Sequence, residues 1–398
     1  MPLPYSRQTI GADEIAAVAH AAGDPFLTGG PGVARFERAL AEAVGARHAI
    51  AVSSGTAALH VAYLAAGLRP GDRVVTSPIT FVATANAAVH CGAEVAFGDV
   101  DARGNLDAAG VGQAVARAGA PALVVPVHYA GHPADVAALA ATVPGAVVVE
   151  DACHALGAVA ADGRPVGACT HAALAVFSFH PVKIITTGEG GAITTNDDLL
   201  ARRCRRLRDH GLVREAAERG VVDEPWGYEM HEPGFNYRLT DLQAALGTVQ
   251  LGRLRAFVAA RRTLAARYAA ALRALPGVAL VAPAPGTESS WHLLPVRLPA
   301  SARRHVYAAL RARAIGVQVH YVPVHRQPFY RQRGAEPAHC PAAEAFYAEE
   351  LSLPCFPGMT DEDVTRVVDA LGEALAAAPS PEKQRPHEGT PRDAHPAW

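Results

Sequence analysis

The residue best suited to covalent chemistry in this chain is Lys183. The chain has 36 basic residues, and all of them except Lys183 and Lys383 are arginines. Arginine can replace lysine in most ion pairs, but it cannot supply the neutral primary amine that forms a Schiff base with a carbonyl compound. Lys183, in the segment FSFHPVKIITTGEGG (177–191), is therefore a candidate nucleophile. Its chance survival in an arginine-rich composition is the alternative, so the other residues must decide.

Two segments before Lys183 contain groups that would serve the same chemistry. Asp151 ends an apolar stretch (146–151), and His154 follows it. A carboxylate at the carboxyl end of a buried parallel strand points into the crevice where α/β proteins bind ligands, although capping of the next helix is the alternative. Gly55 and Thr56 open a helix-like stretch. Helix-start amides with a hydroxyl can bind a phosphate, although capping alone also explains such residues.

Together these residues match the needs of pyridoxal phosphate. That cofactor takes a lysine amine at its aldehyde, a carboxylate at its ring nitrogen and a helix start at its phosphate. Ser178 adds a hydroxyl close to Lys183, and the glycines of 186–191 permit a tight turn after it. Each segment alone is a weak signal, but their order along the chain, phosphate loop then Asp151 then Lys183, indicates this cofactor.

The first half of the chain should form the sheet that positions these groups. Seven short, apolar, β-branched stretches have the pattern of strands buried on both faces. They are 48–54, 73–78, 94–100, 122–129, 146–151, 173–179 and 191–195. Alanine- and leucine-rich stretches such as 55–68 separate them, which predicts an α/β fold with a mostly parallel sheet covered by helices.

A different pattern begins near residue 240. Thr240 and Gln243 predict a capping box that opens a helix to about Leu254, and a long arginine- and alanine-rich helix should follow over 255–274. The later elements expected are strands at 278–283, 291–298 and 316–322, and helices at 301–314 and 360–377. These elements predict a large cofactor-binding domain over 1–254, a smaller α+β domain over 255–378 and a disordered tail over 379–398.

Composition narrows the classes of function. The chain has 398 residues and a net charge of −2, so nothing favours nucleic acid as a partner. We find no apolar run long enough to cross a membrane and no signal-peptide pattern at the N-terminus, which predicts a cytoplasmic protein. The six cysteines and 18 histidines are scattered without zinc-site or disulfide spacing, so we expect no metal.

Longer motifs give a specific resemblance. From about Pro4 to Ala377 the chain resembles the nucleotide-sugar aminotransferases of the type I pyridoxal-phosphate fold. The motifs are PYSRQTI, DPFLTGGP, VSSGTAALH, PITFVATANA, PVHYAGHPAD, EDACHALGA, FSFHPVKIITTGEGG, GFNYRLTDLQAALG, SSWHLLPVRL and GVQVHYVPVHRQPFY. PVHYAGHPAD, FSFHPVK and VQVHYVPVHRQPFY are similar in particular to the branch that aminates carbon 4 of a UDP-linked 4-keto-6-deoxy-N-acetylhexosamine in pseudaminic acid biosynthesis.

The resemblance implies roles for individual cofactor-binding residues. Lys183 should bind the cofactor covalently and move the proton between carbon centres, and Asp151 should pair with the pyridine nitrogen. His154 takes a position near the ring hydroxyl where many relatives have Gln, and Phe81 should stack on the ring. The phosphate should be held by Gly55, Thr56 and Ser178, and by Asn236 reaching across from the partner subunit, which implies a homodimer with shared active sites.

The same resemblance implies contacts with the nucleotide sugar. They are expected from Tyr5, Phe26, Leu27, Thr28, Gly29, His320 and Tyr321. Gly29 departs from the family, which usually has Gln there, so a side-chain hydrogen-bond donor to the sugar is lost at this position. Structural alternatives remain for four side chains: Phe81 as a core aromatic, His154 as a packing residue, and His320 and His325 as solvent-facing residues.

The expected function is transfer of an amino group from L-glutamate to carbon 4 of UDP-2-acetamido-2,6-dideoxy-β-L-arabino-hexos-4-ulose. The main alternative is another nucleotide-linked keto sugar, of the bacillosamine type or from an antibiotic. A sugar dehydratase of the same fold would have His in place of Lys183. A non-catalytic, cofactor-binding regulator would need a DNA-binding module, for which residues 1–20 are too short.

Overall fold

The computed structural model describes residues 2–379, and at its centre lies a seven-stranded sheet. Its strands are β1 (His48–Val52), β2 (Arg73–Thr76), β3 (Glu94–Phe97), β4 (Leu123–Val125), β5 (Val147–Asp151), β6 (Leu174–Ser178) and β7 (Gly191–Thr195). Their order is β1-β7-β6-β5-β4-β2-β3, and only the β1–β7 and β7–β6 pairs are antiparallel. The prediction of seven strands in a mostly parallel sheet is confirmed.

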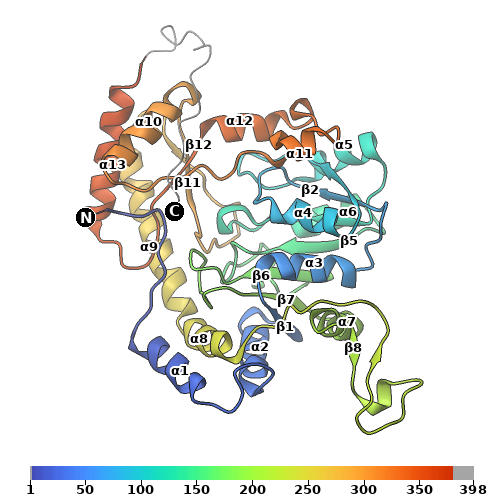
Figure 1. Ribbon diagram of the computed structural model, residues 1–398. Helices are drawn as coiled ribbons and strands as arrows, with labels where there is room; N and C mark the ends of the chain where they lie inside the picture. Colours follow the sequence, from blue (N-terminus) through green and yellow to red (C-terminus); the bar gives the residue numbers. More distant parts are fainter. Residues whose placement is uncertain (1, 380–398) are drawn as a thin grey trace.

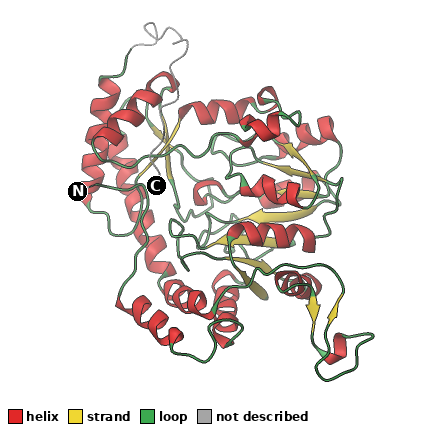
Figure 2. Ribbon diagram, viewed as in Figure 1, coloured by secondary structure: helices red, strands yellow, loops and turns green. Residues whose placement is uncertain are grey.

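Helices cover both faces of this sheet (Figures 1 and 2). They are α2 (Pro31–Val44), α3 (Gly55–Ala65), α4 (Ala83–His90), α5 (Ala108–Ala118), α6 (Val136–Thr142), α7 (Asp198–Arg208) and α8 (Asp241–Gly252). Alternate residues of one strand enter different cores. In β1, Ile50 packs with α3 and α7, whereas Ala49 packs with α2 and α8. Burial of both faces explains why these strands are short and continuously apolar.

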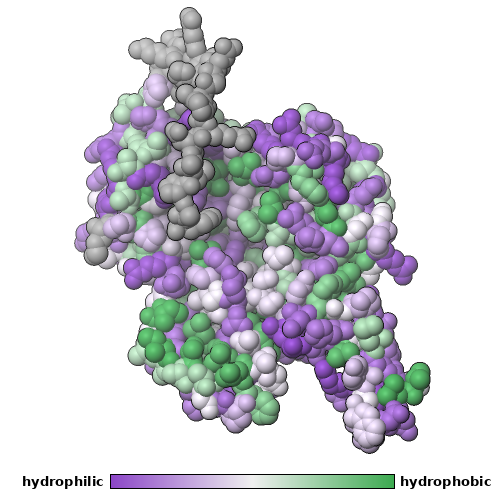
Figure 3. All heavy atoms as spheres, in the orientation of Figure 1, coloured by the Kyte–Doolittle hydropathy of each residue, from purple (hydrophilic) through white to green (hydrophobic). Residues whose placement is uncertain are grey.

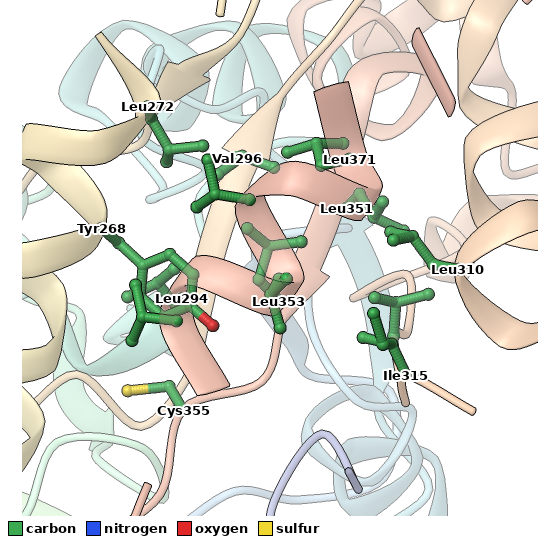
Figure 4. Packing of buried hydrophobic residues seen from close by; sticks show 14 of the residues in the cluster. Tyr268, Leu272, Leu294, Val296, Leu310, Ile315, Leu351, Leu353, Cys355 and Leu371 are labelled. Carbon is green, nitrogen blue, oxygen red and sulfur yellow. The ribbon is translucent and has the colours of Figure 1, made fainter. Parts of the chain in front are cut away.

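The second half builds a smaller unit around a three-stranded antiparallel sheet, β10 (Ala279–Leu280), β11 (Leu294–Arg297) and β12 (Glu350–Leu353). It is packed by α9 (Leu254–Leu272), α10 (Ala300–Ala312) and α13 (Asp361–Ala376). Figure 4 shows its core, where Leu351 and Leu353 of β12 meet Tyr268, Leu310 and Leu371. The capping box of Thr240 and Gln243 is present at the start of α8, as expected.

The expected strand at 316–322 is wrong, and a side chain is the reason. The segment forms one bridge to the small sheet, in which Gln318 and Ser352 exchange backbone hydrogen bonds of 3.3 and 2.8 Å. At the next position in register, the His320 amide donates to the carboxylate of Glu350 (2.8 Å). The Tyr129 hydroxyl donates to the His320 carbonyl (2.8 Å). Side chains therefore end the ladder after one pair.

Several elements had no clear signal in the sequence. They are α1 (Ala12–Ala22), α11 (Pro328–Arg331), α12 (Pro341–Glu349), β8 (Leu212–Val213), β9 (Glu229–Met230) and four 3₁₀ turns at Tyr129–Gly131, Ala216–Glu218, Val324–Arg326 and Pro337–His339. The hairpin of β8 and β9 projects from the body at the lower right of Figure 1. The segment with α11 and α12 returns to the large sheet, where Phe346 packs edge-on against Tyr129 (5.3 Å between ring centroids).

Two further expectations concern the C-terminal tail and the absence of a membrane-spanning segment. The predicted tail lies, from residue 380 onward, outside the described residues. Within residues 2–379, no helix has both the length and the hydropathy needed to span a bilayer.

Candidate active site

Lys183 lies in the loop that joins β6 to β7, and its amide donates to the His180 carbonyl (2.9 Å). Its side chain is half-buried. Burial lowers the pKa of the Lys183 amine, and the nearby Cys153 and Asp151 oppose that shift without reversing it. A lysine whose charged form is poorly solvated reaches the neutral, nucleophilic amine at a lower pH than a solvated one.

Asp151 is the last residue of β5 and is buried beside Lys183. Its Oδ2 accepts a hydrogen bond from the Thr84 hydroxyl on α4 (2.6 Å), and its Oδ1 accepts one from the Cys153 amide (3.1 Å). The carboxylate is thus held from a helix on one side and from its own chain on the other. Position and charge suit it to pair with a protonated ring nitrogen.

His154 lies next to Tyr321, and their Nε2 and hydroxyl are 3.1 Å apart. The two rings stack, with an interplanar angle of 24°. Burial, and then the charge of Lys183, lower the pKa of His154 well below its usual value, so the ring is neutral. Its Nδ1 is buried and has no hydrogen-bond partner among residues 2–379. A polar ligand atom placed there would meet an unpaired ring nitrogen.

The start of α3 forms a close cradle with the end of β6. A Cβ on Gly55 would stand 2.8 Å from the Cβ of Ser178, so only glycine permits this approach. Ser54 caps the helix by accepting from the Ala57 amide (3.1 Å), and Thr56 is exposed at its second position. These amides and hydroxyls suit a phosphate. Asn236 is exposed, and no side-chain hydrogen bond fixes it within the described part of the chain.

The exposure of Phe81, His320 and His325 excludes two of the structural alternatives, a core position for Phe81 and a solvent-facing position for the two histidines. Phe81 is 58% exposed, so it is not a core aromatic, and its ring lies 6.2 Å from that of Tyr321. His320 is 8% exposed and packs 5.6 Å from the ring of Tyr5. His325 is 1% exposed and its Nε2 lies 2.5 Å from Glu344. Neither histidine faces solvent.

The segment from Phe26 to Gly29 is not joined to Lys183 by any contact within residues 2–379. It is exposed and lies beside the start of α8, where the Leu27 carbonyl accepts from the Asp241 amide (2.9 Å). Gly29 has a left-handed φ of 71°, which a Gln at this position would adopt only with strain. It lines a cavity of about 430 Å³ whose arginines are Arg202, Arg205, Arg206, Arg208, Arg214 and Arg238.

The structure thus brings most of the expected residues into one connected group. Its members are Tyr5, Gly55, Phe81, Asp151, His154, Ser178, Lys183, His320 and Tyr321. Five residues that touch this group were not predicted as site residues: Thr84, Cys153, His292, Glu350 and Ser352. Thr84 had a signal, because it stands four residues after Thr80 in the motif PITFVATANA. Nothing local marked Glu350 or Ser352.

The side chains and backbone of this group suit the four functional parts of pyridoxal phosphate. A half-buried amine of lowered pKa, a fixed carboxylate, an unpaired imidazole nitrogen and a glycine-lined helix start are the four groups that the cofactor's aldehyde, ring nitrogen, ring hydroxyl and phosphate require. Lys183, Asp151, His154 and Gly55 with Ser178 would hold these parts in that order.

Comparisons with known proteins agree with this chemistry. The sequence profile of the DegT/DnrJ/EryC1/StrS aminotransferase family matches residues 8–372. The spore coat polysaccharide biosynthesis protein SpsC of Bacillus subtilis (strain 168) is 39% identical over 385 residues, which cover 94% of this chain and 98% of SpsC.

Solved structures are similar over nearly the whole chain. PseC of Helicobacter pylori, an aminotransferase involved in the biosynthesis of pseudoaminic acid, has 29% identity and a TM-score of 0.86, covering 95% of this chain and 100% of PseC. The PLP-form of Spr1654 from Streptococcus pneumoniae has 26% identity and a TM-score of 0.87, covering 96% and 100%.

Proposed function

Because the chain belongs to the DegT/DnrJ/EryC1/StrS aminotransferase family and is a pyridoxal-phosphate-dependent sugar aminotransferase, we propose one reaction within that class. The amino group of L-glutamate passes to carbon 4 of UDP-2-acetamido-2,6-dideoxy-β-L-arabino-hexos-4-ulose, a step in pseudaminic acid biosynthesis. The type I fold, the enzyme class and the cofactor expected from the sequence are confirmed.

One observation carries the choice of sugar. The three segments most similar to the pseudaminic branch meet at a single place in the fold. Tyr129 of PVHYAGHPAD donates its hydroxyl to the His320 carbonyl of VQVHYVPVHRQPFY (2.8 Å). Lys183 of FSFHPVK is close enough that its charge lowers the pKa of His320. The likeness to PseC supports the same choice.

The reaction assigns a task to each residue of the group. Pyridoxal phosphate, when bound, takes the amino group from the donor and passes it to the keto sugar. Lys183 binds the cofactor and, once released, moves a proton as a neutral amine. Asp151 keeps the ring nitrogen protonated, while Thr84 and the Cys153 amide hold that carboxylate in place.

The other residues of the group bind the cofactor's phosphate, cover its ring and contact the sugar. Gly55, Thr56 and Ser178 bind the phosphate, and Phe81 covers the ring. Tyr5, His320 and Tyr321 contact the sugar. The site is completed by a second copy of the chain, whose Asn236 reaches the phosphate and whose segment from Phe26 to Gly29 contacts the nucleotide sugar.

Exposed apolar side chains support a dimer. Ile15, Phe26 and Leu27 are each at least 50% exposed, and apolar surface gathers at the lower left of Figure 3, over α1 and α2. Such a patch is typical of a protein interface. The cytoplasm, where nucleotide sugars are made, is the proposed location.

Mixing two inactive variants should restore activity if the site is shared. We expect Lys183→Ala and Asn236→Ala to be inactive alone. After subunit exchange at equal amounts, about half of the dimers are mixed, and each mixed dimer has one intact site of two, so about a quarter of wild-type activity should return. Lys183→Ala mixed with Asp151→Asn is the control and should recover nothing. Absence of recovery with Asn236→Ala, after exchange is verified by mass, contradicts the shared site.

The two epimeric ketosugars test the substrate. With glutamate as donor, we expect kcat/KM to be at least about tenfold higher for the L-arabino ketosugar than for the D-xylo ketosugar, because a site that hydrogen-bonds a substrate group rejects a misplaced one. The measurement is a side-by-side assay with products identified by mass. A preference for D-xylo keeps the aminotransferase but moves it to the bacillosamine-type branch.

A second candidate sugar has a specific observation in its favour. The 39% identity to SpsC, a spore coat polysaccharide protein, exceeds the 29% identity to PseC. Gly29 also removes the side chain that relatives place at a proposed sugar contact. Activity on neither epimer, with activity on another nucleotide-linked keto sugar, would select this candidate.

A further inference from the structure

A buried carboxyl group lies directly behind His320. Glu350 on β12 is fully buried, and its Oε2 accepts the His320 amide (2.8 Å). Its Oε1 accepts the Ser352 hydroxyl (2.6 Å), whose oxygen is 2.8 Å from His320 Nδ1. Carboxyl, hydroxyl and imidazole therefore form one continuous hydrogen-bonded chain.

The alternation of β12 produces this chain. Leu351 and Leu353 point into the core of the small unit (Figure 4), so Glu350 and Ser352 point to the opposite face, toward His320. Within residues 2–379, Glu350 makes no ion pair. Burial raises the pKa of Glu350 to about 8, although its hydrogen bonds oppose the shift. A buried carboxyl group with a pKa of about 8 keeps its proton at physiological pH.

His320 can change only the position of its proton. Burial, and then Lys183, lower the pKa of His320 to about 3, so the ring is neutral and carries one proton, on Nδ1 or on Nε2. Ser352 is the partner of Nδ1. Nε2 has no hydrogen-bond partner among the described residues, and it is not among their fully buried, unpartnered side-chain atoms.

We propose that Glu350 and Ser352 are positioning residues that supply a proton through His320 to the substrate. When Glu350 is protonated, its Oε1 donates to Ser352, Ser352 donates to Nδ1, and Nε2 carries the ring proton. When a proton passes to the substrate, three protons move, each to the next group in the hydrogen-bonded chain. The Nε2 proton goes to the substrate's carbonyl oxygen, the Ser352 proton goes to Nδ1, and the Glu350 proton goes to Ser352.

The balance of this step suits amination of a ketone. The carbonyl oxygen leaves as water when an amine replaces it, so it must gain protons. The relay provides one proton and leaves Glu350 as a carboxylate, and no imidazolium forms. After the product leaves, solvent supplies a proton at His320 Nε2, and the reverse shift through Nδ1 and Ser352 returns a proton to Glu350. The effect of the relay on turnover rests on the proposed function, in which the sugar lies beside His320. The position of the protons on Glu350, Ser352 and His320 does not depend on that proposal.

Among the groups around His320, Glu350 is the one whose pKa is brought near neutrality, while burial lowers the pKa of Lys183 from its usual value. Glu350 faces Tyr129, Tyr321 and Arg303. His320 faces Lys183, His154, His292, Tyr5 and Tyr321. Burial raises the pKa of all three tyrosines and lowers the pKa of both neighbouring histidines. A pH-dependent change at His320 near pH 8 that Glu350→Gln abolishes would therefore report Glu350.

Nitrogen-15 NMR of histidine-labelled full chain tests the relay without turnover. The His320 signals are assigned by their loss in His320→Gln. In wild type we expect the proton on Nε2 below about pH 8 and on Nδ1 above it. Glu350→Gln should keep it on Nε2 at every pH, because the Gln carbonyl oxygen must accept the His320 amide, which leaves the NH₂ group to donate to Ser352. Ser352→Ala should remove the pH dependence. A single, pH-independent tautomer in wild type that Glu350→Gln does not alter overturns the proposal.

Kinetics supply the second measurement. Glu350→Gln should lower kcat about 100-fold with little change in KM, since the amide holds His320 but cannot release a proton. Glu349→Gln is the matched control, because its carboxylate pairs with Arg297 (2.6 Å) outside the relay, and it should behave as wild type in both measurements. Wild-type kcat in Glu350→Gln on an accepted substrate also overturns the relay. If Glu350→Gln does not fold, the pH dependence in Ser352→Ala decides.

Discussion

Replacing Lys183 by alanine should reduce amino transfer about 10⁴-fold, and replacing it by arginine should do the same. Alanine has no amine, and the guanidinium of arginine stays protonated at any pH the protein survives. The structure adds a reason why no other group substitutes. His154 and His320, two nearby nitrogen-containing side chains, have lowered pKa values and are imidazoles, which do not form the required covalent link.

Borohydride reduction locates the attachment directly. The reduced protein should carry the cofactor on a peptide that contains Lys183 and retain it on denaturation. Lys383→Arg is the matched control, since it removes the other lysine and should leave labelling and turnover unchanged. Label on Lys383, or full activity in Lys183→Ala, contradicts the assignment.

Asp151→Asn should lower kcat/KM by about 10² to 10⁴-fold, the range of a proton-handling group. Two donors, the Thr84 hydroxyl and the Cys153 amide, point at the carboxylate, so an asparagine leaves one of them facing an NH₂ group. It also removes the negative charge that would keep a ring nitrogen protonated. Steady-state kinetics and the absorbance of the bound cofactor give the readout.

Asp99→Asn is the control for Asp151→Asn. Asp99 is also a buried carboxylate, and it accepts the Ala342 and Ala343 amides (2.9 and 2.8 Å) at the start of α12. Its replacement should lower the melting temperature but leave kcat of the folded enzyme unchanged. An equal loss of kcat in the two variants would reduce Asp151 to a structural residue.

The central sheet could be predicted because burial on both faces leaves a continuous apolar pattern in the sequence of each strand. Residues 147–149 and 174–177 are continuous apolar runs, as expected for strands covered on both faces, and Asp151 and Ser178 lie at the ends of these strands. Lys183, Asp151 and Gly55 were predictable for a related reason. Their chemistry depends on residue type and on a strand end or helix start that the local sequence indicates.

The rest depends on contacts between distant segments. GVQVHYV has the composition of a strand, but Glu350 and Tyr129 take up the hydrogen bonds of His320, thirty or more positions away in the chain. The β12 strand itself is only Glu350–Leu353, which is too short for its alternation to be distinctive. Phe26 to Gly29 were assigned to the sugar by resemblance, and within one chain they lie beside α8, so their contact with the sugar stays a prediction.

The path of α9 and α12 has a mechanical consequence. α9 runs without a break for 19 residues from the end of α8 into the small unit, and the segment of α11 and α12 crosses back, where Tyr330 donates to Asn86 (2.7 Å). Two such crossings connect the two units, and each contact across them opposes movement of the units as independent lobes. Lys183 from one unit and His320 from the other are thus aligned by folding itself. An arrangement of this kind is preorganised, because folding rather than substrate binding brings these two side chains together.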